Sequence, residues 1–174
     1  RDFLSKLTPS DVESANARSH RASIEQCLRS NYTVKRFFRI GSFGNGTSVY
    51  SYSDVDYLAS VTMADLSNDS NYVLQKMRWI LSKRFPFTNV SVRCPAVRVP
   101  FGKGGADAHE IVPANSRGMN AAGFEVFQIP NGEGKWMSTS PESHNAYVLG
   151  QHQRLSSKVK PLVRFVKAWK FYNS

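Results

Sequence analysis

The stretch from Asp54 to Val61 constrains the fold more than any other part of this chain, because its residues alternate in the manner of a β-strand. Successive side chains of a strand point to opposite faces of the sheet. One face therefore carries Asp54 and Asp56 together. The other face carries the apolar side chains Val55, Tyr57, Ala59 and Val61. We predict a strand that presents both carboxylates on the same face, which Leu58 and Ser60 share.

A Gly-Ser pair, Gly41 and Ser42, precedes these acids. The β-branched and aromatic residues of Thr33–Ile40 predict a strand that ends at this pair, and the following NGTSVYS predicts a short helix. A glycine turn beside the start of a helix offers backbone N–H groups to a phosphate, and the Ser42 hydroxyl adds a further donor.

Carboxylates two residues apart on one strand face repel each other unless a cation lies between them. Oxygen ligands favour a hard divalent ion such as Mg²⁺, which binds through one or two carboxylates and the phosphates of a substrate. Gly41 and Ser42 would then hold a triphosphate, while Asp54 and Asp56 hold the metal that bridges it. This arrangement indicates phosphoryl or nucleotidyl transfer.

Two-metal catalysis usually uses a third carboxylate. The segment DAHEIVPA supplies two candidates. Glu110 lies within a predicted strand, Ala108–Pro113, and Asp107 lies at its start on the opposite face with His109. We favour Glu110, because an acid inside an apolar strand is costly unless something pairs with it. Asp107 stays as the alternative.

The remaining signals predict helices at both ends of the chain and further strands between them. We expect helices from Thr8 to about Ser30, over Asn71–Arg84 and from about Lys160 onward, and helical structure from Trp136. We expect further strands in NVSVRCPAVRVPF, which Pro95 interrupts, and in GFEVFQIP.

Positive charge dominates the chain, with 23 Lys and Arg against 13 Asp and Glu. Residues 70–106 contain seven basic side chains and no acid, and residues 151–174 contain six, again without acid. A phosphate-bearing partner explains this charge, and so does a solubilising surface. No apolar run reaches the roughly 18 residues of a membrane helix. With no leader-like start at Arg1, we expect a cytoplasmic protein without a membrane partner.

Other residues that could carry chemistry have simpler interpretations. Cys27 and Cys94 are isolated in the sequence, which predicts buried, reduced thiols. The histidines show no metal-ligand spacing and are interpreted as structural or surface residues; they are His20, His109, His144 and His152. The tryptophans are expected in the core; they are Trp79, Trp136 and Trp169.

Taken together, GSFGNGTSVYSYSDVDYL, HEIVPA, WMSTSPESH and LVRFVKAWK resemble the DNA polymerase β-like nucleotidyltransferases. More closely, the chain is similar to the cyclic GMP-AMP synthase/oligoadenylate synthetase group and its bacterial relatives, the CD-NTases. The resemblance implies an α+β fold, a polymerase β-like core with a mixed β-sheet flanked by helices and long helices at both ends. It also implies that residues 1–174 form one catalytic core, a fragment of a longer two-lobed protein whose second, helical domain is missing here.

By this resemblance Gly41 and Ser42 contact the nucleoside triphosphate, and Lys167 matches a family lysine near the phosphates. A solvated surface role for Lys167 stays open, and Lys160 is its nearest rival. The same resemblance assigns two Mg²⁺ or Mn²⁺ ions to three residues that are both catalytic and metal-binding. These residues are Asp54, Asp56 and Glu110. Many family members have Asp in place of this Glu.

The resemblance implies an enzyme that condenses nucleoside triphosphates into a cyclic or short linear oligonucleotide messenger and releases pyrophosphate, in bacterial anti-phage signalling. The substrates would be ATP and, as further candidates, GTP or pyrimidine triphosphates, with a nucleic acid or a protein as a candidate activator. Two alternatives stay open: a nucleotidyltransferase that acts on RNA ends or on a protein, and a basic nucleic-acid-binding module without catalysis.

Overall fold

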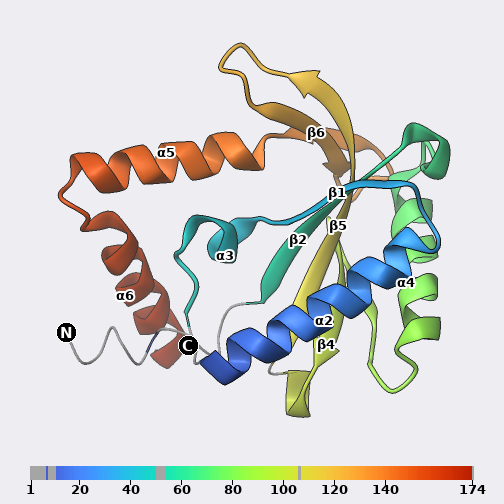
Figure 1. Cartoon of the computed structure of the whole chain (residues 1–174), viewed down its shortest axis with the longest axis horizontal. Helices are drawn as coiled ribbons and strands as arrows, with labels where there is room; N and C mark the ends of the chain where they lie inside the picture. The colour runs from blue at the N-terminus through green and yellow to red at the C-terminus, as the bar shows by residue number, and fades with distance from the viewer. Residues whose placement is uncertain (1–6, 8–10, 50–53, 106, 174) are drawn as a thin grey trace.

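The computed structural model describes residues 7, 11–49, 54–105 and 107–173, and in these residues one mixed β-sheet is flanked by helices (Figure 1). The strands are β1 Val34–Arg39, β2 Val55–Val61, β3 Ser91–Arg93, β4 Ala96–Phe101, β5 Asp107–Met119, β6 Glu125–Pro130 and β7 Trp136–Thr139. The helices are α2 Asp11–Arg29, α3 Gly41–Asn45, α4 Ser70–Arg84, α5 Pro141–Arg154 and α6 Val159–Tyr172. Two short 3₁₀ turns, Met63–Asp65 and Lys103–Gly105, complete the described elements. The expected α+β class is confirmed.

The sheet is built around a parallel pair, β2 and β5, in its centre. The strand order is β1-β2-β5-β4-β3, and β6 pairs with the second half of β5 and with β7. All pairings other than β2 with β5 are antiparallel. A parallel pair needs a long crossover, and here the chain between β2 and β5 includes α4 and two further strands.

One face of the sheet is covered by α2 and α4, whose apolar sides pack on the odd-numbered residues of β2 (Figure 1). The buried contacts include Ile24 and Leu28 from α2, Leu74 and Met77 from α4, and Tyr57 from β2. Burial of these side chains is the main favourable contribution to folding. Leu58, an even-numbered residue of β2, packs in a second cluster that contains Val112 and Phe127. The predicted alternation of β2 is therefore confirmed.

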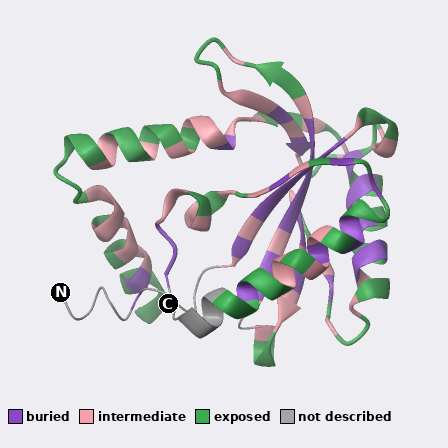
Figure 2. Cartoon of the chain, in the orientation of Figure 1, coloured by how far each residue is buried: buried purple, intermediate pink, exposed green. Residues whose placement is uncertain are grey.

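Helices α5 and α6 extend away from the sheet, and each contains a single buried residue, the rest being half-buried or exposed (Figures 1 and 2). Of α6, Ala168 is the buried residue, while Leu162, Val166 and Trp169 are 62%, 58% and 69% exposed. The described helices include none with the length and apolar character needed to cross a membrane.

Several expectations on the secondary structure need correction. The short helix is Gly41–Asn45 rather than NGTSVYS, since residues 46–49 are not helical and residues 50–53 lie outside the described part. Helical structure does not begin at Trp136, because Trp136–Thr139 pairs with β6 before α5 starts at Pro141. Residues 8–10, where the first helix was expected to start, also lie outside the described part.

The expected burial was wrong for Trp79 and Trp169, which are exposed, and for Cys94. Trp136 is partly buried, and its indole N–H donates to the backbone oxygen of Asn68. Cys27 is buried as expected, but Cys94 is exposed. Both thiols are free.

Candidate active site

The register of the central strand pair brings the predicted acids together. In the parallel pairing of β2 with β5, Asp56 lies opposite Glu110. Asp54 precedes β2 and shares the face of Asp56, as expected from the alternation. Asp107 lies on the opposite face of β5, where it contacts His20 of α2. The structure therefore brings Glu110, and not Asp107, to the two aspartates.

Gly41 begins α3 directly beside these acids. Its φ of +60° lies in the left-handed region that favours glycine. A Cβ atom at this position would overlap the carboxylate of Asp56. The backbone N–H of Ile40 donates to the backbone oxygen of Asp56 at 2.9 Å, which fastens the turn to β2. The glycine is therefore required both by the backbone conformation and by the close approach.

A cleft of about 370 Å³ joins the turn, the acids and the last helix. It is lined by Ser42, Asp54, Asp56, Glu110, Lys167, Lys170 and Phe171. A larger hollow of about 420 Å³ lies between α2 and α4, but no carboxylate lines it. The cleft is the place where the described chain combines converging acids with basic side chains from α6.

Burial and mutual repulsion act on the acids of this cleft. Burial, followed by the nearby charges of Glu110 and Asp54, raises the pKa of Asp56 to about 6, although the backbone N–H of Ser42 and the charge of Lys167 oppose this. Burial and the charge of Asp54 also raise the pKa of Glu110. A site that raises the pKa of two neighbouring carboxyl groups favours a cation between them.

Basic side chains surround the acids on two sides. Lys167 of α6 donates to the backbone oxygen of Thr47 at 3.3 Å, and burial lowers the pKa of its ammonium group. Arg98 of β4 lies opposite Glu110 in the antiparallel register, and its Nε is 3.5 Å from Oδ2 of Asp54. The cleft can thus receive an anionic substrate beside its acids.

The sequence predicted six of the residues at this site. Gly41, Ser42 and Lys167 lie beside the three acids, and Lys160 lies near Gly46 rather than in the lining of the cleft. Sequence reasoning missed Arg98, Lys170 and Phe171. Lys170 follows Lys167 by one helical turn, so its spacing could have indicated it. Arg98 becomes evident only from the strand pairing.

The donor set of the cleft fits a hard divalent cation. Asp54, Asp56 and Glu110 offer only carboxylate oxygens, which are the ligands that Mg²⁺ and Mn²⁺ accept in proteins. The raised pKa of Asp56 also favours a bound cation, because the nearby Lys167 offsets only part of the effect of burial and of the neighbouring acids. The residues present therefore fit the metal that the sequence predicted.

Known proteins share this fold. The structure of CdnC from Escherichia coli MS115-1 with ATP is 22% identical, covers 95% of this chain and 54% of its own, and superposes with a TM-score of 0.68. The structure of DncV, the cyclic AMP-GMP synthase of Vibrio cholerae, with a linear intermediate is 14% identical, covers 99% of this chain and 64% of its own, and superposes with a TM-score of 0.75. The fold is that of the CD-NTases, a class of nucleotidyltransferases.

The family follows from the sequence itself. The family model described as Second Messenger Oligonucleotide or Dinucleotide Synthetase domain matches residues 1–151, and the chain belongs to this family. A cyclic AMP-AMP-AMP synthase of Escherichia coli is 25% identical over 142 residues, which is 80% of this chain and 43% of that protein. The chain thus spans about half the length of these relatives.

Proposed function

We propose that this chain is the catalytic core of a cyclic oligonucleotide synthase that joins nucleoside triphosphates, ATP among them, into a cyclic or short linear messenger. The observation that carries the proposal is the convergence of three carboxylates on the Gly41-Ser42 turn in one cleft. The family supports the reaction class. ATP is supported by the relative named as a cyclic AMP-AMP-AMP synthase and by the similar structure with ATP.

In this proposal the chain binds the triphosphate between its turn and its last helix. The backbone N–H of Gly41 and the Ser42 hydroxyl donate to the phosphate oxygens. Lys167 lines the same cleft and neutralises charge on the same phosphates as a point charge. Both contacts hold the triphosphate with its α-phosphorus near the carboxylates, which lowers the entropic cost of the reaction.

Asp54 and Asp56 would hold two Mg²⁺ or Mn²⁺ ions, and Glu110 would hold one of them. When bound, such ions neutralise the triphosphate and make the acceptor hydroxyl more acidic. Glu110 orients the acceptor hydroxyl in line with the α-phosphorus. The hydroxyl oxygen forms a new bond to the α-phosphorus as its proton passes to solvent water. The bond between the α-phosphorus and the bridging oxygen breaks, and pyrophosphate leaves.

We propose that residues 1–174 are one catalytic unit of a longer protein. The exposed apolar side chains of α6, among them Leu162 and Trp169, support this, because a large apolar surface is usually covered. A cytoplasmic location and a role in anti-phage signalling complete the proposal. They are supported by the resemblance to the bacterial CD-NTases and by the need for nucleoside triphosphates.

The proposal is tested with the native full-length protein and its Asp56→Asn variant. Each is incubated with four labelled nucleoside triphosphates and Mg²⁺ or Mn²⁺, and the phosphatase-treated products are separated by thin-layer chromatography. We expect a phosphatase-resistant product from the native protein and none from the variant. A labelled RNA or protein instead of a small product would favour the first alternative. Steeply salt-dependent duplex binding without any product would favour the non-catalytic module.

A further inference from the structure

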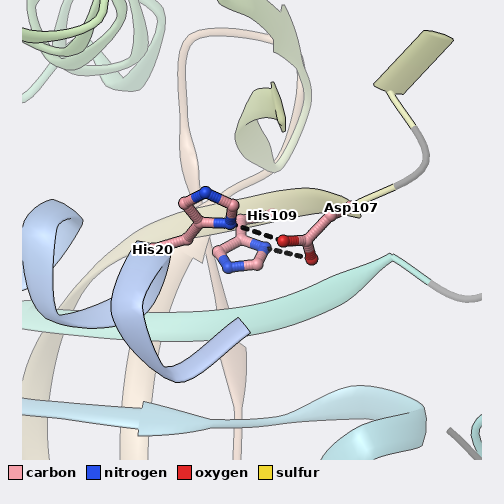
Figure 3. A group of neighbouring side chains, drawn as sticks. All are labelled: His20, Asp107 and His109. Carbon is pink, nitrogen blue, oxygen red and sulfur yellow. Dashed lines mark hydrogen bonds and ion pairs between the residues drawn. The ribbon is translucent and has the colours of Figure 1, made fainter. Parts of the chain in front are cut away.

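A second group of metal-ligating side chains lies on the other face of the sheet from the cleft. His20 comes from α2, and Asp107 and His109 come from the start of β5. Figure 3 shows the three side chains pointing toward one another across the space between the helix and the strand. Asp107 and His109 share one face of β5, whereas Glu110 points to the opposite face. The group is therefore separate from the three carboxylates of the cleft.

One carboxylate lies between two imidazole rings. Nδ1 of His20 is 2.5 Å from Oδ2 of Asp107, and Nδ1 of His109 is 3.7 Å from Oδ1 of the same group (Figure 3). Each residue has a ligand atom that lies within 4.8 Å of the ligand atoms of the other two. Tetrahedral ligands about 2.1 Å from a zinc ion lie roughly 3.4 Å apart. The distances from Asp107 to the two histidines, one to each carboxylate oxygen, lie on either side of that value.

The buried ring nitrogens of His109 lack hydrogen-bond partners within the described residues. The side chain of His109 is fully buried. The backbones of Ala17 and Ala108 lie near the ring, but neither makes a hydrogen bond of ordinary geometry. The 3.7 Å to Asp107 is too long for a hydrogen bond. Burying an unpaired polar group is costly, so a ligand for Nδ1 would remove that cost.

The surroundings of the group suit a bound ion. His20 stacks on Phe101 at 4.0 Å between ring centroids, and Phe101 and Tyr57 also contact the ring of His109. These aromatic contacts fix the orientation of both imidazoles. The side chains of His20 and Asp107 are 32% and 22% exposed, so an ion can enter from solvent and keep a water as its fourth ligand.

We propose that His20, Asp107 and His109 form a binding site for a transition-metal ion of the Zn²⁺ class, separate from the carboxylate cleft. Two imidazoles and one carboxylate are a donor set that Zn²⁺ accepts and Mg²⁺ does not prefer. The bound ion fastens α2 to the start of β5. Because Glu110 directly follows His109, the ion also fixes the strand segment that positions Glu110 opposite Asp56.

The site is tested by binding of Zn²⁺ alone to the native full-length protein after removal of metals with a chelator. Equilibrium dialysis is performed in excess Mg²⁺, which competes for the carboxylates of the cleft, and bound zinc is measured by elemental analysis. We expect one equivalent bound to the native protein and at least about 10-fold weaker binding by His20→Ala and Asp107→Asn. The matched control is His144→Ala, an exposed histidine outside the group, which binds as the native protein does.

Thermal unfolding gives a second readout that needs neither nucleotide nor turnover. At the same zinc concentration, Zn²⁺ is expected to raise the Tm of the native protein and of His144→Ala, and to raise the Tm of Asp107→Asn clearly less. Asp107→Asn keeps the volume of the side chain, so it is informative even if His20→Ala folds poorly. Absence of zinc binding by the native protein, or equal binding by the native protein and Asp107→Asn, would overturn the proposal. Both results are independent of whether the cleft synthesises a messenger.

Discussion

Asp56 and Glu110 lie side by side in the register of the parallel strands β2 and β5, although 54 positions separate them in the sequence. Both carboxyl groups have a raised pKa, and for each the largest cause is burial and the next is the charge of a neighbouring acid. Holding these two charged acids together in a buried position therefore lowers the stability of the fold. Such an arrangement is typical of a site that binds cations or transfers protons.

Gly41→Ala is expected to lower product formation strongly. A Cβ at residue 41 would overlap Asp56, and φ of +60° is also unfavourable for alanine. The matched control is Gly104→Ala, which has a φ of +68° but no atom near the added Cβ. We expect the positive φ to cost both variants about 1–2 kcal/mol of unfolding free energy, the overlap to add a further loss in Gly41→Ala, and only Gly41→Ala to lose about 100-fold or more in turnover. Equal activity of the two variants would show that the close approach does not matter.

Lys167→Gln is expected to lower kcat/KM for the triphosphate by about 10-fold, which corresponds to roughly 1.4 kcal/mol of lost stabilisation. The reason is the position of the ammonium group in the lining of the cleft, where it acts on Asp56 and would act on the phosphates. Lys158→Gln, an exposed lysine just before α6, serves as control. Steady-state kinetics of both variants provide the measurement. If both lose the same activity, the effect comes from general surface charge rather than from the cleft.

Asp65→Asn is expected to alter stability in a pH-dependent manner. Hydrogen bonds from the hydroxyl of Thr62 and the backbone N–H of Thr33 lower the pKa of Asp65 below its usual value of 3.8. The carboxylate therefore stabilises the fold above that pH and loses its contribution as the pH falls below it. The side chain is partly exposed, so we expect a loss of less than about 1 kcal/mol near pH 7.

Urea unfolding of the native protein and Asp65→Asn across this pH range measures the difference. The gap in unfolding free energy should narrow as the pH falls below 3.8. A gap that stays constant down to the lowest accessible pH would contradict the role given to these hydrogen bonds.

Much of the fold and the cleft could be predicted because the signals are local. The alternation of residues 54–61 defines β2 and the face of its acids, and Pro161 in the first turn of α6 marks the start of that helix. The strand Trp136–Thr139 was missed because four residues are too few to show a period, and only the pairing with β6 makes them a strand.

Features that depend on long-range pairing could not be predicted from the sequence. His20 and Asp107 are 87 positions apart, so the spacing of histidines could not indicate their contact. Arg98 reaches Asp54 because β4 lies beside β5 in the sheet, which no local pattern shows. The exposure of the apolar side chains of α6 could not be predicted either, because their spacing is the same as that of a buried helix.

If Asp56 and Glu110 act together in nucleotidyl transfer, loss of either carboxylate stops pyrophosphate release, which is measured for the native full-length protein, Asp56→Asn and Glu110→Gln. The assay uses saturating ATP and the other triphosphates with Mg²⁺, and circular dichroism checks that each variant is folded. We expect steady release by the native protein and a loss of about 10³-fold or more in each folded variant. Release by either folded variant at the native rate would show that its carboxylate has no part in nucleotidyl transfer.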